Sequence, residues 1–67
     1  MAIFKVLGSD GDTFCKPLGE DDNRWHALAL AREHHEAGQD VLVVRVLESG
    51  IALPEASGRR GEPFIDG

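Results

Sequence analysis

A nearly continuous run of branched aliphatic residues, DVLVVRVLE at 40–48, constrains the fold more than any other segment of this 67-residue chain. Such a run is typical of a central strand that is covered on much of both faces. The rest of the chain must therefore supply neighbouring strands and a covering layer. Side chains alternate between the faces of a strand, so two rows are expected. These rows are Leu42, Val44 and Val46 on one face, and Val41, Val43, Arg45 and Leu47 on the other.

Two strands are predicted ahead of this run. Residues 2–7 (AIFKVL) alternate in the manner of a half-buried strand. The Asp-Gly pair within 8–12 favours a tight hairpin turn into a short strand at 13–16, which Pro17 ends because proline lacks an N–H for the ladder. The two rows of the first strand are Phe4 and Val6 on one face, and Ile3 and Leu7 on the other.

A single helix is predicted at residues 22–37. The acids and the asparagine of EDDN at 20–23 are typical of a helix start, where they accept otherwise unpaired N–H groups. Gly38 supplies the left-handed cap that ends many helices. Helical spacing then predicts an inner and an outer stripe. The inner stripe is Ala27, Leu30, Ala31, His34 and Ala37, and the outer stripe is Asp22, His26, Ala29, Glu33 and Glu36.

The segment after the aliphatic run predicts one more strand and a loop. Ser49-Gly50 favours a tight turn into an antiparallel strand at 51–53, which Pro54 ends. Residues 55–61 (EASGRRG) are expected to form a mobile loop because they are polar and rich in glycine. Residues 62–67 are expected to form a short edge strand or a tail.

These elements predict one α+β domain over residues 1–67, of β-β-α-β-β order, with one helix packed on one face of a small, mainly antiparallel sheet. One helix covers only one face of the sheet. The other face would expose an apolar row too large to leave in water on so small a domain. We therefore expect that face to meet a second copy of the chain or another partner. Its predicted residues are Ile3, Leu7, Val41, Val43 and Leu47.

The charge balance limits the partners. Twelve acidic residues against seven Lys plus Arg give a formal net charge of -5 at pH 7. Direct binding of nucleic acid and of an anionic membrane both depend on positive charge, so we expect neither. The single cysteine, Cys15, cannot form an internal disulfide, and no apolar run is long enough to cross a bilayer. We therefore expect a cytoplasmic protein whose partner is another protein.

The residues that could bind a metal or act in catalysis do not have the sequence spacing of such a site. His34 and His35 are adjacent, so they point about 100° apart on a helix. His26 precedes them by more than two turns. His34 falls on the inner stripe, where one hydrogen bond would close the edge of the core. Residues 10–12 (DGD) are expected to form a turn rather than a calcium loop. We expect no enzyme activity, no metal and no cofactor.

Three groups of residues are candidates for binding a partner. Trp25 is either a lid over the core rim or an apolar anchor, since Trp and Arg dominate interface hot spots. The carboxylates are either a helix cap and a solvated face, or the groups that dock on a basic surface. The SGRRGE loop is either a solvated tip or a contact point of a larger interface. The candidates are Asp21, Asp22, Trp25, Glu33, Glu36, Arg59 and Arg60.

The order of elements also carries a resemblance. A helix (DDNRWHALALAREHHEAG), a long aliphatic strand (DVLVVRV), a tight turn (ESG) and a final PFID segment resemble the layout of small acidic phage-encoded inhibitors, including some anti-CRISPR proteins. The resemblance implies a protein that binds the nucleic-acid-reading surface of a bacterial defence complex. The same layout resembles small bacterial β-β-α-β-β domains that have no assigned function.

Three functions follow as hypotheses. The first is a non-enzymatic protein-interaction module, an inhibitor that occupies the basic surface of a nucleic-acid-binding complex with its carboxylates and Trp25. The second is a homodimeric structural domain of a bacterial family. The third is a small metal- or phosphate-binding protein that uses His34, His35 and Arg59.

Overall fold

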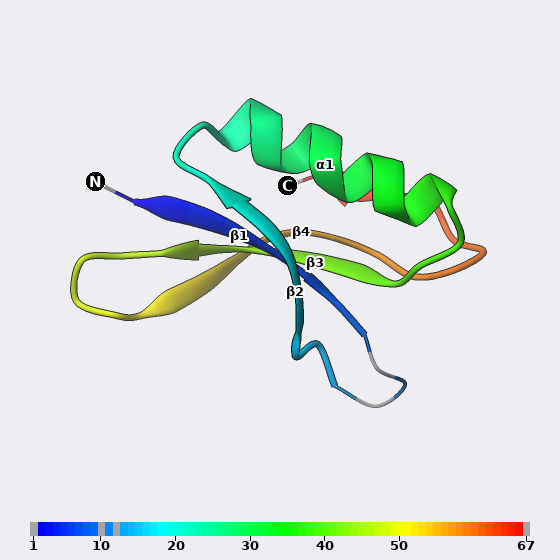
Figure 1. The fold of residues 1–67 in the computed structure, drawn as a ribbon, viewed down its shortest axis with the longest axis horizontal. Coiled ribbons are helices and arrows are strands. Elements are labelled where there is room, and N and C mark those ends of the chain that lie inside the picture. The colour runs from blue at the N-terminus through cyan, green and yellow to red at the C-terminus, as the bar shows by residue number, and fades with distance from the viewer. Residues whose placement is uncertain (1, 10, 12, 67) are drawn as a thin grey trace.

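The computed structural model describes residues 2–9, 11 and 13–66. Its elements are β1 (Ile3–Gly8), β2 (Lys16–Asp21), α1 (Arg24–Glu36), β3 (Val41–Val46), β4 (Ala52–Gly58) and β5 (Ile65–Asp66). The strands form one sheet in the order β2-β1-β3-β4-β5, with every neighbouring pair antiparallel. Helix α1 lies across one side of this sheet (Figure 1). The predicted α+β class and β-β-α-β-β order are confirmed, and the predicted edge strand at 62–67 is present as the two-residue β5.

Capping residues set the ends of α1. The side-chain oxygen of Asn23 accepts the backbone N–H of Trp25 at 2.9 Å and that of His26 at 3.4 Å. These N–H groups have no partner within the helix, so the cap satisfies them. Gly38 has a φ of 94°, a left-handed conformation that suits glycine after a helix. The predicted helix is therefore confirmed, but it spans residues 24–36 rather than 22–37, with Asn23 as its cap and Asp22 and Ala37 outside it.

The core lies between α1 and the middle of the sheet. Val6 of β1 and Val43 of β3 lie opposite each other and are fully buried. On the helix, the buried side chains include Ala27 and Ala31, which are short enough to let α1 approach the strands closely. The core cluster is Val6, Ala27, Leu28, Ala31, Val41, Val43 and Ala56, with Phe4, Leu18, Leu30 and Phe64 packed against it.

The structure exchanges the two faces that were predicted for the central strand. Val41 and Val43 are fully buried in the core, so they do not belong to the uncovered face. The register explains the correction, because Val43 lies opposite Val6 and paired residues share a face. Leu47 lies beyond the end of β3. We call the uncovered side of the sheet the open face; the register assigns to it Ile3, Lys5, Leu7, Pro17, Glu20, Leu42, Val44, Val46, Ala52, Pro54, Ser57 and Ile65.

Strands β2 and β4 also differ from the predicted ones. The strand expected at 13–16 begins instead at the last of these residues and continues through Pro17. Strand β4 continues through Pro54, so residues 55–58 are strand rather than the expected loop. Each proline lies beside a shift in the register of its strand. The missing N–H of proline is tolerated at such irregularities, which is why neither proline ends its strand.

Candidate functional site

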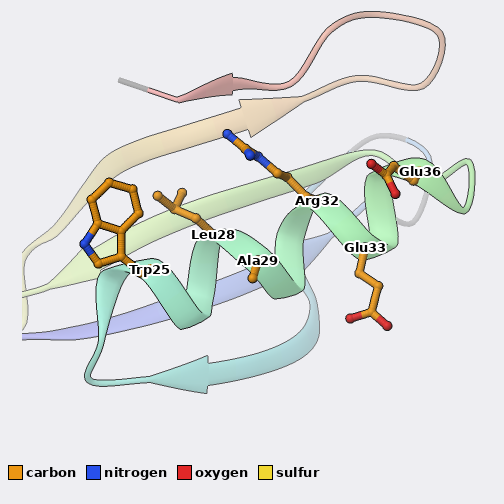
Figure 2. Close-up of a pocket in the computed structure, with 6 residues that line it drawn as sticks. All are labelled: Trp25, Leu28, Ala29, Arg32, Glu33 and Glu36. Carbon is orange, nitrogen blue, oxygen red and sulfur yellow. The ribbon is translucent and has the colours of Figure 1, made fainter.

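The outer surface of α1 carries an open groove of about 330 Å³. Its lining residues recur every three or four positions, so they fall on one stripe of the helix. Figure 2 shows Trp25 near the start of the helix and Glu36 near its end, with Arg32 between them. We call this surface the helix groove; it is lined by Trp25, Leu28, Ala29, Arg32, Glu33 and Glu36.

Trp25 forms the exposed aromatic end of the helix groove. Its side chain is 69% exposed. The guanidinium carbon of Arg24 lies 5.3 Å from the centre of the indole, a cation–π contact. An indole exposed to this degree does not cover the core. Of the two interpretations of Trp25, the geometry therefore favours the interface anchor over the lid.

A bulge in β4 holds this end of the helix groove in place. The β3–β4 register shifts between Val43 and Val44, which leaves Glu55 as the extra residue of β4. The carboxylate of Glu55 lies 3.4 Å from Arg24 Nε and 3.2 Å from Arg45 Nε. The contact with Arg45 is an ion pair without an aligned hydrogen bond. Glu55 thus links Arg24, the first residue of α1, to the sheet. Arg24 in turn supports the indole.

The middle of the helix groove is supported by the C-terminal segment. The guanidinium carbon of Arg32 lies 5.6 Å from the centre of the Phe64 ring. Phe64 packs in turn against His35, with ring centres 6.0 Å apart. His35 Nε2 lies 2.9 Å from the carbonyl oxygen of Arg59, which accepts its N–H when that nitrogen carries the hydrogen. This chain of contacts fixes Arg32 over the loop that follows β4.

The helix groove is apolar at one end and acidic at the other. Trp25 and Leu28 supply aromatic and aliphatic surface. Glu33 and Glu36 are exposed in the second half of α1. Such an arrangement can hold an apolar side chain of a partner at one end while the carboxylates pair with cationic groups at the other.

The structure brings together only part of the predicted binding set. Trp25, Glu33 and Glu36 all line the helix groove, whereas Asp21 and Asp22 lie just before the helix and outside its lining. The Oδ1 atom of Asp21 accepts the backbone N–H of the capping residue Asn23 at 2.7 Å. This hydrogen bond stabilises the charged carboxylate and holds the pKa of Asp21 below its ordinary value of 3.8.

Arg59 and Arg60 lie in the loop between β4 and β5, away from the groove lining. Both are exposed. The backbone of each is engaged, because the Arg59 carbonyl oxygen faces His35 and the Arg60 N–H donates to Oδ1 of Asp40. Their main chain therefore anchors the loop to the end of α1 and to the start of β3.

The three histidines have separate partners. His34 Nδ1 lies 2.7 Å from Oε1 of Gln39, which confirms the single hydrogen bond predicted at this half-buried position. His26 Nδ1 lies 3.4 Å from Oδ2 of Asp21. Within residues 2–9, 11 and 13–66, no three His, Cys, Asp or Glu side chains are close enough to hold a metal ion. The turn predicted at residues 10–12 lies partly outside the described residues.

Three residues that line the helix groove were not predicted from the sequence. Leu28 stands next to the inner stripe and is buried, while Ala29 and Arg32 carry no obvious binding signal of their own. The signal that finds them is the spacing from Trp25, since positions three, four, seven and eight residues further along share its side of a helix. A helix can therefore present a second apolar stripe beside the one that faces the core.

No protein-family model, no curated protein and no solved structure matches this chain. No helix in the part of the chain that the structure describes has both the length and the apolar character needed to cross a membrane. Function is therefore inferred from the residues of the helix groove and of the open face.

Proposed function

We propose that this chain is a non-enzymatic protein-interaction module that inhibits a nucleic-acid-binding complex by occupying its basic surface. The supporting observation is the helix groove, where an exposed indole and two carboxylates share one stripe of α1. We place this activity in the cytoplasm, because a chain with the single cysteine Cys15 gains no internal disulfide from an oxidising compartment.

Charge complementarity selects a basic partner. The chain carries a net charge of -5, so a basic surface attracts it over a distance of several ångströms and an acidic surface repels it. A surface rich in Lys and Arg is what nucleic-acid-binding proteins present to phosphates. The carboxylates of Glu33 and Glu36 pair with those cations in place of phosphate groups.

The indole supplies most of the affinity in this mechanism. Aromatic side chains that are desolvated at the centre of an interface dominate binding free energy, while charges at the rim mainly set the association rate and the orientation. Trp25 therefore enters an apolar pocket of the partner, and the acidic end of the helix groove fixes the register. Inhibition follows because the same partner side chains cannot contact the nucleic acid while this chain is bound.

Affinity capture from a bacterial lysate tests this function with matched variants. Trp25→Ala removes the anchor, and the double variant Glu33→Gln/Glu36→Gln removes the two groove carboxylates. Glu48→Gln/Glu62→Gln is the control: each double variant loses two carboxylates and changes the net charge from -5 to -3, but the control lies outside the groove lining. We expect the wild type and the control to capture a nucleic-acid-binding protein. Added DNA or RNA should release that protein.

Binding constants for the captured protein then sharpen the test. We expect Trp25→Ala to weaken binding by about 30-fold or more, the loss typical of an aromatic hot spot. The loss of both groove carboxylates is expected to weaken binding about tenfold at low salt, and less as salt screens the charges. Capture of no nucleic-acid-binding protein, or an equal loss in the control, overturns the proposal. A homodimeric domain, the alternative function, is supported by a different surface, the open face.

A further inference from the structure

We propose that the open face pairs two copies of this chain, with Val44 at the centre of a two-fold symmetric interface. The open face lies on the side of the sheet opposite α1 (Figure 1). Ile3 is 41% exposed and Ile65 is 67% exposed, at opposite ends of this surface. Between them the half-buried side chains of the central strands continue the apolar surface: Leu7, Leu42, Val44 and Val46.

The charge of the open face identifies a second copy as its occupant. The open face carries one cation, Lys5, and one anion, Glu20, which lie directly opposite each other on β1 and β2. Their charges cancel, although the chain as a whole has a net charge of -5. Two copies repel each other through their acidic surfaces, so an electrically neutral apolar face is where they can meet at least cost. A basic partner, by contrast, gains nothing from charge at this face.

The shape of the open face also suits self-association. A hollow of about 160 Å³ is lined by Leu42, Pro54, Glu55, Ala56, Ser57 and Ile65, and the Glu55 carboxylate is paired with Arg24 and Arg45. An aliphatic side chain from a second copy can fill it, and two-fold symmetry makes the same contact twice. Val44 lies on β3, the central strand of the sheet, so a symmetric contact centred there places Val44 against Val44 of the second copy.

The size of the open face sets the expected affinity. The four longer strands, with a spacing of about 4.8 Å and a rise of about 3.3 Å per residue, give a face of about 20 Å by 20 Å. Two such faces bury somewhat more than about 800 Å² in total, less than the about 1,200–2,000 Å² of stable specific interfaces and in the range of weak, transient ones. We therefore expect a dimer that forms at micromolar rather than nanomolar concentration.

This pairing leaves the helix groove of each copy exposed, because α1 lies on the other side of the sheet. A dimer thus presents two helix grooves, and a partner with two basic sites would bind it with increased avidity. The pairing through the open face does not depend on what the helix groove binds.

Sedimentation velocity from about 1 to about 200 µM tests the pairing directly, because that range spans the expected dissociation constant. We expect a monomer-to-dimer transition that changes little with salt, since Lys5 and Glu20 leave the interface with no net charge. Val44→Lys places two like charges in the interface and should weaken the dimer at least about 100-fold. Ser49→Lys adds the same charge at an exposed turn and should leave the dimer intact.

Cysteine trapping gives a second readout that does not depend on the stability of a lysine variant. In a Cys15→Ser background, a short bismaleimide should crosslink Val44→Cys between two copies, because a residue at the two-fold axis faces its own copy across sheets packed about 10 Å apart, a separation too long for a direct disulfide. Ser49→Cys in the same background should react much more slowly. A wild type that stays monomeric at about 200 µM, a dimer that Val44→Lys leaves unchanged, or equal trapping at both positions overturns the proposal.

Discussion

Val6 of β1 lies directly opposite Val43 of β3, and both side chains are fully buried on the side of the sheet that α1 covers. Side chains alternate along a strand and paired residues share a face, so this one pair fixes the side on which each residue of β1 and β3 lies. Val43 therefore belongs to the core and Val44 to the open face. The aliphatic strand β3 therefore contributes side chains to both the core and the open face.

Two alanine substitutions test this assignment. Val43→Ala leaves a cavity in the core and should lower the free energy of unfolding by about 2 kcal/mol. Val44→Ala truncates a side chain of the open face and should lower it by less than about 1 kcal/mol. Urea unfolding at a concentration below that of dimer formation measures both. Equal effects, or a larger effect at Val44, would contradict the assignment.

A buried glycine gives a second test, at the packing of the C-terminal segment. A Cβ at Gly58 would lie 2.8 Å from Cδ2 of His35 and 2.9 Å from Cδ1 of Phe64, so Gly58→Ala must displace one of two packed rings. We expect a loss of about 1–3 kcal/mol in the free energy of unfolding. Gly19→Ala is the matched control, because its Cβ would lie 2.5 Å from Cδ2 of Leu30, the end of a side chain that can rotate away, rather than against two packed rings. A larger loss at Gly19 in urea unfolding would count against the observed packing.

Stability at acid pH tests the start of α1. The pKa of Asp21 is lowered in the folded chain, chiefly because its carboxylate accepts the N–H of Asn23. A lowered pKa means that the carboxylate stabilises the fold above the unfolded value of 3.8, and that this contribution is lost as pH falls through the folded value. Asp21→Asn should therefore lower the melting temperature at pH 6, and the difference from wild type should shrink below pH 3.8. Thermal melts across this range measure it, and a difference independent of pH would rule the linkage out.

The helix and the central strand could be predicted because each carries a local signal. The EDDN segment, Gly38 and alanines at helical spacing all indicate one helix, and its inner stripe contains the buried residues Ala27 and Ala31. The aliphatic run indicates β3 through composition alone. Signals of this kind depend on neighbours in the chain, which is why the fold class could be derived without knowledge of the tertiary contacts.

The face of β3 could not be predicted, because both of its rows are apolar. Arg45 shares a row with Val43, and that row was expected on the uncovered face. Arg45 lies on the helix side instead, where Glu55 of the β4 bulge supplies its counter-charge. A bulge depends on how two strands pair. Neither the bulge nor the continuation of β4 through Pro54 can therefore be predicted from the local sequence.

The candidate site was predicted in part. Trp25, Glu33 and Glu36 were expected as binding residues, and the structure brings them into one groove. Asp21 was grouped with them on charge alone, but its carboxylate is engaged in the local geometry of the helix start. Charge can suggest which residues bind, whereas the choice among them depends on which side of the helix each one occupies.

Site-specific photo-crosslinking from the helix groove tests the proposed function most directly. A benzophenone amino acid at Ala29, an exposed lining residue, lies between the aromatic and the acidic ends of the groove. The same group at Ser49 in the exposed turn before β4 is the control. In a bacterial lysate we expect position 29, and not position 49, to give an adduct with a nucleic-acid-binding protein, and we expect added DNA or RNA to abolish it. No adduct at position 29, or the same adducts at both positions, would contradict a partner-binding role for this groove.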